Sequence, residues 1–435
     1  MARRRRPLPP HFAHWAGALA LAALVRIAYV WAVTRHDRVV GDQIYYSVQA
    51  RANAFGHWFV QPFDEGRPGA DHPPLTVLLL TPITFVFRHG AFVMAQRWFN
   101  VSIGIVNVGL LGYLVKRSAG ERAAVVAMGL AAVQASWWMG DGLVLSEPAS
   151  VLAILLLLLA VLHLTERPTT RRAVLGGALG GVVAFGRPEM ALLVPFLVLP
   201  AAAVGLRDHA TRRSALVRMG VALGAAVIVV TPWIGWNLAR FEDRVLISSN
   251  DGFTLLGANC PTTYFGPGIG TYDIGCALAP VIPPGLDSSQ ASAIRSRIAV
   301  DYVRAHLTRL PLVGAARLGR LALVYGVGNE VTSGPAEGRP TWAMWIGVVQ
   351  HWLLLPFAVL GAFRLDRRHR RLVLAVPAVS ILAAVVIASY WRIRVPADIA
   401  LVLLAATGID SLLGSQITLA RAKTARSLGS KWARG

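Results

Sequence analysis

A candidate for acid–base chemistry lies early in the chain, at Asp42. It belongs to a short polar stretch, residues 40–50, that directly follows a long apolar segment. Apart from Asp37 in the turn before it, Asp42 is the first carboxylate after that segment. A carboxylate held beside a polar cavity can accept a proton from a hydroxyl group. We therefore predict that Asp42 is a catalytic base at the outer face of a membrane enzyme.

Two further acidic motifs stand where helices are expected to begin. Asp71 and His72 are followed by two prolines, which fit the first turn of a helix because the N–H groups there lack partners. A helix that begins at this point would favour an anion near its N-terminus. Ser146 and Glu147, followed by a proline, form a similar start. Capping alone also explains both motifs, so each is either a helix cap or part of a site.

Arginines occur in two turns between apolar runs. Arg187 lies between a glycine and a proline, and a guanidinium held in this way could bind a phosphate with two hydrogen bonds. Arg392 and Arg394 lie in an aromatic turn, residues 390–396, on the side of the membrane where basic residues are uncommon. Arginines at the ends of spans also extend to lipid headgroups, and aromatic residues anchor helices at the interface. Both interpretations stay open for these turns.

The two cysteines, Cys260 and Cys276, fall in one polar segment between apolar runs. In an oxidising compartment such a pair is expected to form a disulfide, which would contribute roughly 3 kcal/mol in the chain-entropy model. Two free thiols are the alternative. No Cys/His cluster has the spacing of a metal site, so neither a metal nor another cofactor is expected.

The elements that must position these residues are membrane helices. Hydrophobic residues make up 55% of the chain and charged residues 15%, whereas a soluble domain has roughly 25% charged residues. The net charge is +21, which could indicate nucleic-acid binding. The basic residues, however, gather in short loops between apolar runs, as is typical of the cytoplasmic loops of membrane proteins. We therefore expect an all-α polytopic membrane protein that binds membrane lipids and no nucleic acid.

This charge distribution predicts the topology. We read residues 12–33 as an uncleaved first span that runs outward. Full spans are then expected at about 91–115, 123–140, 147–164, 173–187, 188–206, 215–236, 341–363, 372–390 and 397–415. The run 75–87 is too short to cross, and of 310–328 and 341–363 only one can cross, for which we choose the second. Both termini are then cytoplasmic, and residues 416–435 form a basic cytoplasmic tail.

Two long segments fall on the outer side in this topology. Residues 34–74 form the first outer loop and residues 237–310 the second. Within the second loop, residues 290–309 carry apolar side chains at helical spacing with basic residues between them, which predicts an amphipathic helix on the membrane surface. Residues 1–415 are expected to form one transmembrane catalytic domain with its active site outside the cytoplasm.

The order of these motifs resembles a known family. An early Asp followed by tyrosines, then His-Pro-Pro-Leu at 72–75, Ser-Glu-Pro at 146–148 and Gly-Arg-Pro at 186–188 are similar to the C-type glycosyltransferase superfamily. Within it, the chain resembles the dolichyl-phosphate-mannose-protein mannosyltransferase-like group, glycosyltransferase family 39, in its bacterial form. Residues 259–266 resemble actinobacterial members. The resemblance extends over about residues 10–410 and implies a bundle of about 10–12 transmembrane helices with interfacial helices.

The resemblance also implies roles for the candidate residues. Asp42 corresponds to the loop Asp that serves as the base. Donor phosphate would be bound by residues that carry or can gain positive charge: Arg187, His72, Arg392 and Arg394. Substrate would contact Tyr45, Tyr46, Asp71 and Glu147. The family often has Asp-Glu where this chain has Asp42 and Gln43, and the missing carboxylate leaves the acceptor type and any divalent metal open.

The function implied is an inverting transfer of a hexosyl or pentosyl group from a polyprenyl-phosphate-linked sugar donor to an acceptor hydroxyl. The acceptor would be a glycan, lipid or protein at the outer face of the bacterial cell membrane. The alternatives are a lipid or polysaccharide transporter or flippase, and a non-catalytic assembly protein. A transporter would be expected to have inverted repeats and charges at the membrane midplane. No internal repeat is evident, and apart from Arg26 the candidate residues lie at outer helix ends.

Overall fold

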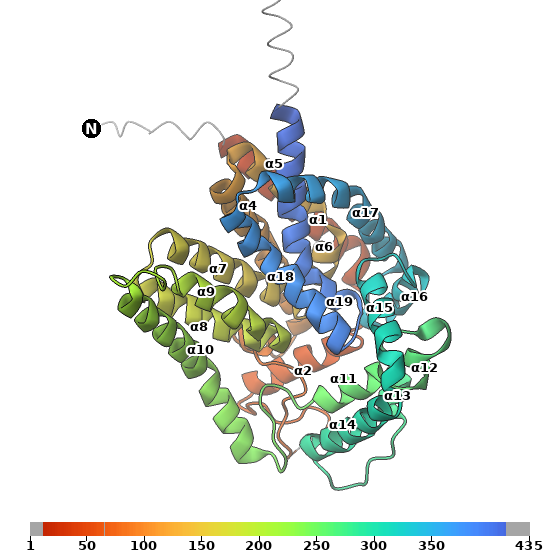
Figure 1. Cartoon of the computed structure of the whole chain (residues 1–435). Coiled ribbons are helices and arrows are strands. Elements are labelled where there is room, and N and C mark those ends of the chain that lie inside the picture. Colours follow the sequence, from red (N-terminus) through yellow and green to blue (C-terminus); the bar gives the residue numbers. More distant parts are fainter. Residues whose placement is uncertain (1–11, 65, 415–435) are drawn as a thin grey trace, which may run out of the picture.

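The computed structural model describes residues 12–64 and 66–414, which are predominantly helical (Figure 1). The expected all-α fold class is therefore confirmed for this part of the chain. One isolated bridge, between Val60 and Pro68, is the only extended pairing among the described residues. The basic tail predicted at 416–435 lies outside them.

Seven helices of the described chain have the length and composition to cross a membrane. They are α1 with its continuation (Phe12–Thr34), α4 (Phe92–Ala119), α7 (Glu147–Glu166), α10 (Arg212–Arg240), α17 (Thr341–Arg364), α18 (Arg367–Val386) and the last helical segment (Trp391–Gly414). A bent pair, α5 (Glu121–Val133) and α6 (Ala135–Asp141), makes an eighth if its two helices count as one span, and the bend between them is 57°. The chain is thus a multi-pass membrane protein.

The number of candidate spans is lower than the ten to twelve expected from the sequence because two of the expected spans are short. Residues 173–187 belong to α8 (Thr170–Gly186), which has 17 residues. The expected span 188–206 is the shorter apolar segment Pro188–Ala202. Full crossing needs about 20 residues in a typical bilayer. These two elements instead pack against α7 and α10 within the bundle.

The two apolar runs that were not expected to cross the membrane, 75–87 and 310–328, form only short helices. The run 75–87 forms α3 (Leu75–Phe87), with the expected bounds. The run 310–328 does not form one helix: α15 (Leu310–Leu321) ends before Leu323 and Gly326, which have φ of 56° and 62°, and α16 (Val327–Ser333) follows. A left-handed residue ends a helix, so α15 has only 12 residues. The assignment of the full crossing to 341–363 agrees with the 24 residues of α17.

Small residues allow the closest helix contacts. A Cβ added to Gly177 of α8 would lie 1.9 Å from the carbonyl oxygen of Ala222 in α10. At Gly181, one turn later, it would lie 2.8 Å from the carbonyl oxygen of Ala226. Two glycines four residues apart thus bring the backbones of α8 and α10 together, as in membrane helix pairs of the small-xxx-small type. The glycine run 176–181 is thus a helix-packing surface.

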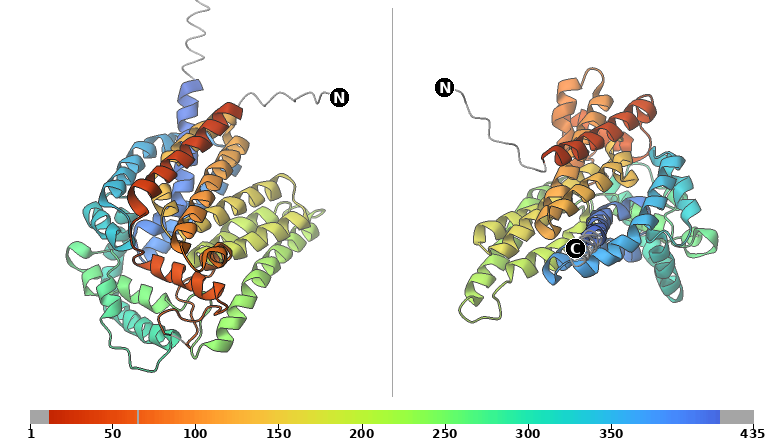
Figure 2. Two further views of the ribbon diagram at one scale, coloured as in Figure 1. Left: turned by 180° about the vertical axis from the view of Figure 1, so that it is seen from behind. Right: turned by 90° about the horizontal axis from the view of Figure 1, so that it is seen from above.

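The polar elements gather at one end of the bundle. There lie α2 (Asp42–Ala54), α11 (Asp251–Ala258), α12 (Pro261–Tyr264), α13 (Ile274–Leu278) and α14 (Ser288–Ala305), while the start of α1 and the end of Trp391–Gly414 lie at the opposite end (Figures 1 and 2). The segment predicted as an amphipathic helix is α14. It begins with a capping box at Asp287 and Gln290 and packs on α11, where Ser292 Oγ accepts a 2.8 Å hydrogen bond from the Gly252 amide.

The predicted disulfide is present. Cys260, before α12, is bonded to Cys276 in α13. The bond closes a loop of the second polar segment, the residues 237–310 that were expected to form the second outer loop. The cross-link therefore stabilises the elements that stand over the polar end of the bundle.

Candidate active site

Asp42 is placed by a tight turn and a helix start. Gly41 has φ of 56°, and a Cβ at this position would lie 2.8 Å from the carbonyl oxygen of Ala336. Only glycine therefore fits between the first apolar helix and α2. Asp42 is the first residue of α2, and its side chain is 31% exposed. The local sequence thus holds this carboxylate at the edge of a cavity.

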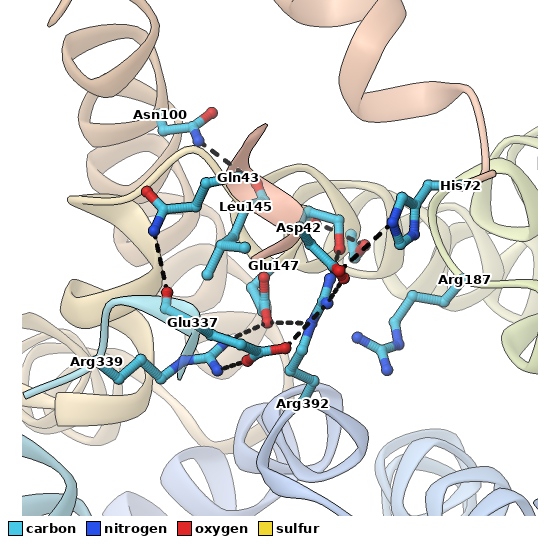
Figure 3. A network of polar contacts seen from close by, with 12 residues as sticks. Asp42, Gln43, His72, Asn100, Leu145, Glu147, Arg187, Glu337, Arg339 and Arg392 are labelled. Atoms are coloured by element: carbon cyan, nitrogen blue, oxygen red, sulfur yellow. Dashed lines mark hydrogen bonds and ion pairs between the residues drawn. The ribbon is translucent and has the colours of Figure 1, made fainter. Parts of the chain in front are cut away.

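Two cationic or ionisable groups face Asp42. Arg392 forms an ion pair with its Oδ2, and His72 Nε2 lies 3.5 Å from its Oδ1 (Figure 3). The His72 ring is held between Tyr45 and Tyr46, with ring centroids at 4.9 Å and 5.0 Å. Tyr45 and Tyr46 are both buried, so they fix the imidazole from the side away from Asp42.

Arg392 is the centre of the charge network. Besides Asp42, its Nε donates to Glu147 at 2.8 Å, and its Nη2 donates to Ser146 Oγ at 2.8 Å. Its Nη1 also lies 3.4 Å from Glu337. The Arg392 side chain is only 8% exposed. A buried guanidinium is tolerated when carboxylates and hydrogen bonds compensate it, and here residues from three other segments do so.

A second arginine completes the network. Arg339 Nη2 donates to Glu147 at 2.7 Å, and its Nη1 pairs with Glu337. The sequence analysis did not identify Glu337 or Arg339. A signal was present, because residues 338–340 repeat the Gly-Arg-Pro triplet of residues 186–188 in another segment between apolar runs. Four charged groups, Glu147, Glu337, Arg339 and Arg392, are thus linked directly beneath Asp42 (Figure 3).

The segment that carries Ser146 and Glu147 is fixed by buried amides. Asn100 in α4 donates to the Leu143 carbonyl at 2.8 Å. Gln43 accepts from the Val144 amide at 3.3 Å and donates to the Glu337 carbonyl at 3.0 Å. Gln43 therefore ties two site segments together through one hydrogen-bond acceptor and one donor. An ionised glutamate at this position would lack the donor, which gives a structural reason for the amide.

Arg187 approaches the site from the turn after α8. Its Nε donates to Glu189 at 2.7 Å, and its guanidinium extends toward the Asp42–Arg392 pair (Figure 3). Asp71 lies farther along the same cavity, where it accepts hydrogen bonds from Gln61 at 3.0 Å and Ser249 at 3.1 Å. Both residues line the cavity that contains Asp42.

Arg394 has a different position. It is buried, its guanidinium lies 4.0 Å from the centre of the Trp391 ring, and it does not line the cavity. A helical turn at 391–394 directs Arg392 to the network and Arg394 into the bundle, because residues two apart on a helix do not share a face. The structure therefore brings Arg392, but not Arg394, to the group around Asp42.

The cavity has a volume of about 800 Å³, which lies within the range of pockets for small ligands. It is lined by three members of the charge network, Glu337, Arg339 and Arg392, and by Tyr46, Pro188 and Tyr390. The second polar segment covers it with hydroxyl, amide and carboxylate groups: Ser248, Asn250, Asp251, Thr254, Thr262, Thr271, Tyr272 and Asp273. Residues separated by more than 300 positions in the sequence thus enclose one polar chamber.

The electrostatics favour an ionised Asp42. Burial alone would raise the pKa of this carboxyl, but the charges of His72 and Arg392 and their hydrogen bonds hold the pKa well below its usual range. Asp42 is therefore a carboxylate at neutral pH, able to accept a hydrogen bond from a hydroxyl group. Burial also raises the pKa of the Tyr46 phenol, which keeps that side chain neutral.

One group of potential metal ligands occurs in the described part of the chain, at Cys260, Asp273 and Cys276. The two sulfurs are joined in the disulfide and are therefore not thiolate ligands. In the charge network, Asp42, Glu147 and Glu337 are each paired with an arginine. Positive charge at the site is thus supplied by guanidinium groups.

Comparison with known proteins gives one family match and several similar folds. Residues 71–236 match the family model described as dolichyl-phosphate-mannose-protein mannosyltransferase. No curated protein sequence matches the chain. The matched segment includes Asp71, His72, Glu147 and Arg187 and ends within α10.

Among solved structures, the oligosaccharyltransferase of Archaeoglobus fulgidus in the apo form superposes with a TM-score of 0.55 at 13% identity, over 96% of this chain and 52% of that chain. The archaeal oligosaccharyltransferase AglB from Archaeoglobus fulgidus, in complex with an inhibitory peptide and a dolichol-phosphate, gives a TM-score of 0.55 at 14% identity, over 94% of this chain and 51% of that chain. ArnT from Cupriavidus metallidurans bound to undecaprenyl phosphate gives 0.44 at 15% identity, over 92% and 78%.

The chain spans about half the length of the archaeal structures that it matches. At these identities the similarity establishes the fold. The family match and the shared fold confirm the resemblance expected from the motifs: this is a membrane protein with the fold of the C-type glycosyltransferases, similar over residues 71–236 to the dolichyl-phosphate-mannose-protein mannosyltransferases.

Proposed function

We propose that this protein is an inverting glycosyltransferase that moves a sugar from a polyprenyl-phosphate donor to an acceptor hydroxyl. The observation that carries the proposal is the pair of Asp42 and Arg392 at one edge of a polar cavity of about 800 Å³, in a fold shared with glycosyltransferases. One group accepts a proton, and the other stabilises an anion. These are the two tasks of a transfer that has a lipid phosphate as its leaving group.

Asp42 acts on the acceptor. Its carboxylate takes the proton from the acceptor hydroxyl while the hydroxyl oxygen forms a bond to the anomeric carbon. The bond between that carbon and the phosphate oxygen breaks on the opposite face of the sugar, so the configuration inverts. The proton remains on Asp42 until it passes to water after the product leaves.

Arg392 acts on the donor. In the structure its charge is compensated by Asp42 and Glu147, with Glu337 near by. A donor phosphate at Arg392 would take over part of this compensation. Asp42 would then lose part of its ion pair and become a stronger base only when the donor is bound. Arg187 and His72, which line the same cavity, would share the charge that develops on the phosphate.

The acceptor would enter from the side of the second polar segment. Hydroxyl, amide and carboxylate groups from residues 248–273 line that side of the cavity. Tyr272 and Tyr390, whose rings lie 5.8 Å apart, add aromatic surface. Such a lining suits a polyhydroxylated acceptor. In the orientation expected from the basic loops, this side faces the outside of a bacterial cell membrane, and both termini are cytoplasmic.

The direct test is incubation of the purified protein in lipid with a panel of polyprenyl-phosphate hexoses and pentoses and candidate acceptors, with products identified by mass spectrometry. Asp42→Asn should lower turnover by about 10²–10⁴-fold, the usual contribution of a general base, while donor binding is kept. Asp64→Asn is the matched control, because Asp64 lies in the same expected outer loop, residues 34–74, but does not line the cavity.

Turnover of Asp42→Asn near the wild-type rate would show that the base is misassigned. Movement of lipid-linked sugars across vesicles without any glycosylated product would instead support the transporter alternative. The anomeric configuration of the product, measured by NMR, tests inversion separately.

The proposed reaction needs no divalent metal, since arginines hold the carboxylates of the charge network and supply the positive charge. We therefore expect the turnover rate to stay within about twofold when a chelator is added, a difference that corresponds to less than 1 kcal/mol. Loss of turnover with the chelator and recovery with one particular cation would contradict this part of the proposal.

A further inference from the structure

A second cavity, of about 970 Å³, lies away from the candidate active site. It is formed between the last turns of α7, the apolar segment 196–201 and α18 from Arg367 to Leu382. Its lining divides into two parts. One part is basic and comes from residues 367–371, and the other is apolar and includes Phe196, Leu197 and Leu374.

The two cavities stand at opposite ends of the same helices. Ser146 and Glu147, at the start of α7, belong to the active-site network, and Thr165, near its end, lines the second cavity. In α18 the direction is reversed, since Arg367 lines the second cavity and Ile387 the first. Both helices have 20 residues, so the basic end of the second cavity and the first cavity are about 30 Å apart along the bundle, the thickness of a hydrocarbon core. They therefore face opposite leaflets.

The basic end of the cavity contains two arginine side chains that are not paired within the described part of the chain. Arg368 is anchored, with Nε 2.9 Å from Thr165 Oγ1. Arg367 and Arg371 are exposed and make no hydrogen bond or ion pair among the described residues. The nearby carboxylate of Asp366 caps α18 through the amides of Arg368 and His369 at 2.9 Å and 3.0 Å and also binds the His369 ring.

The apolar end continues the same face of α18. Arg367 and Arg371 are four residues apart, and Leu374, Ala378 and Leu382 follow at intervals of three, four and four. Residues at this spacing lie on one side of a helix. Leu374 and Leu382 are 39% and 41% exposed, and Phe196, on the facing segment, is 58% exposed. One stripe thus leads from free arginines at the helix start to apolar surface that continues to Leu382, about 16 Å beyond Arg371.

We propose that this cavity binds an anionic glycerophospholipid of the leaflet opposite the active site. The headgroup phosphate would lie against Arg367 and Arg371 at the N-terminus of α18, where the helix dipole also favours an anion. One acyl chain would lie along Leu374, Ala378 and Leu382. Four arginines in the first turns of a helix repel each other and the dipole, and a phosphate in this position relieves both effects.

The preference for basic residues in cytoplasmic loops explains why these arginines lie on this side of the membrane. It does not explain why they stand at one end of a cavity with an apolar lining. Loop charges that only set topology need no cavity and no apolar extension. Arg212 and Arg213, at the start of α10, are a pair of that simpler kind, since they are exposed and do not line either cavity. They provide a matched control for the removal of two charges.

The test is native mass spectrometry of the full-length protein in detergent, with phosphatidylglycerol or phosphatidylcholine of the same acyl chains added. We expect a retained phosphatidylglycerol adduct, weakened about twenty-five-fold in R367Q/R371Q, since each arginine near an anionic surface contributes about fivefold. R212Q/R213Q should keep the adduct. Ala378→Trp should weaken it by filling the acyl groove, and thermal unfolding verifies that each variant is folded.

Equal retention of the two lipids, or equal loss in the two double variants, would overturn the proposal. Inorganic phosphate in excess should not displace the lipid; if it does, and Ala378→Trp has no effect, the site is one for a free anion. Undecaprenyl phosphate is added in a separate arm. Preferential retention of that lipid over phosphatidylglycerol would overturn the choice of a glycerophospholipid.

Discussion

The two ends of the segment from Arg367 to Arg394 use the same amino acid in opposite ways. Near the active site, Arg392 is 7% exposed and is bound to carboxylates from three other segments. At the far end, Arg367 and Arg371 are exposed and unpaired within the described chain. The first arrangement neutralises a buried charge, and the second leaves charge available at the surface.

The difference shows what burial demands of a charged group. A guanidinium inside a membrane protein is costly unless its donors are satisfied, so its partners must be supplied from elements that the fold brings together. At the surface, water and lipid phosphates satisfy the same group, and its position depends only on where the helix begins. Substitutions should therefore have large effects at the first end and small effects at the second.

The largest effect is expected for Arg392→Ala. The change leaves Glu147 buried with one partner fewer and removes the charge proposed to bind the donor phosphate. We expect turnover to fall by about 10²–10³-fold and the free energy of unfolding to fall by about 3–5 kcal/mol. Product formation and denaturant unfolding in detergent measure the two effects. Arg367→Ala is the control, and equal losses in both variants would show that the two ends do not differ.

A smaller effect is expected for Gln43→Glu. The buried amide donates to the Glu337 carbonyl, and a carboxylate in its place would face that oxygen without a proton. We expect a loss of about 1–3 kcal/mol in the free energy of unfolding. Gln43→Met, which removes the hydrogen bonds without adding charge, should cost less. A variant with glutamate that is as stable as the wild type would mean that the amide does not tie these segments together.

The ion pair at Asp42 predicts a pH dependence. Its pKa is lowered in the folded protein, so the stability it contributes is present above the unfolded pKa of about 4 and is lost as pH falls below that value. The wild type should therefore lose more thermal stability than Asp42→Asn between pH 6 and pH 3. Parallel losses in both proteins would argue against the ion pair.

The smallest effect is expected for R367Q/R371Q on the reaction itself. Both side chains are exposed and distant from Asp42, so stability should change by no more than about 0.5 kcal/mol and turnover by less than about twofold. Melting temperature and initial rate in neutral detergent, without anionic lipid, provide the measurement. A tenfold loss of turnover under these conditions would show that the far end acts on the site.

Much of the scaffold could be predicted because its cause is local. Apolar runs of membrane length form helices wherever they occur, and α3 and α17 begin and end within a few residues of the predicted bounds. The break after α15 was harder to foresee, since Leu323 adopts a left-handed conformation that its residue type does not favour. The disulfide could be expected because the chain has only two cysteines.

The site could be predicted only in part, because some of its residues have a local sequence signal and others are brought together only by long-range contacts. Asp42, Glu147 and Arg187 follow turns and helix starts that are visible in the sequence. Glu337 and Arg339 lie just before the expected span 341–363, and although residues 338–340 repeat the Gly-Arg-Pro triplet, nothing local indicates that Arg339 binds a carboxylate 192 residues away. Arg392 and Arg394 have the same sequence signal, and only the rotation of a short helix separates their roles.

The sequence alone thus determined that this is a multi-pass helical membrane protein, with Asp42 at a turn after the first apolar segment and a disulfide in the second polar segment. These features follow from hydropathy, glycine at a tight turn and a single cysteine pair, which act over short stretches of chain. Tertiary structure decided which charges meet. Asp42 and Arg392 are 350 residues apart and come together only when the helices pack, because the buried guanidinium of Arg392 is compensated by carboxylates from other segments.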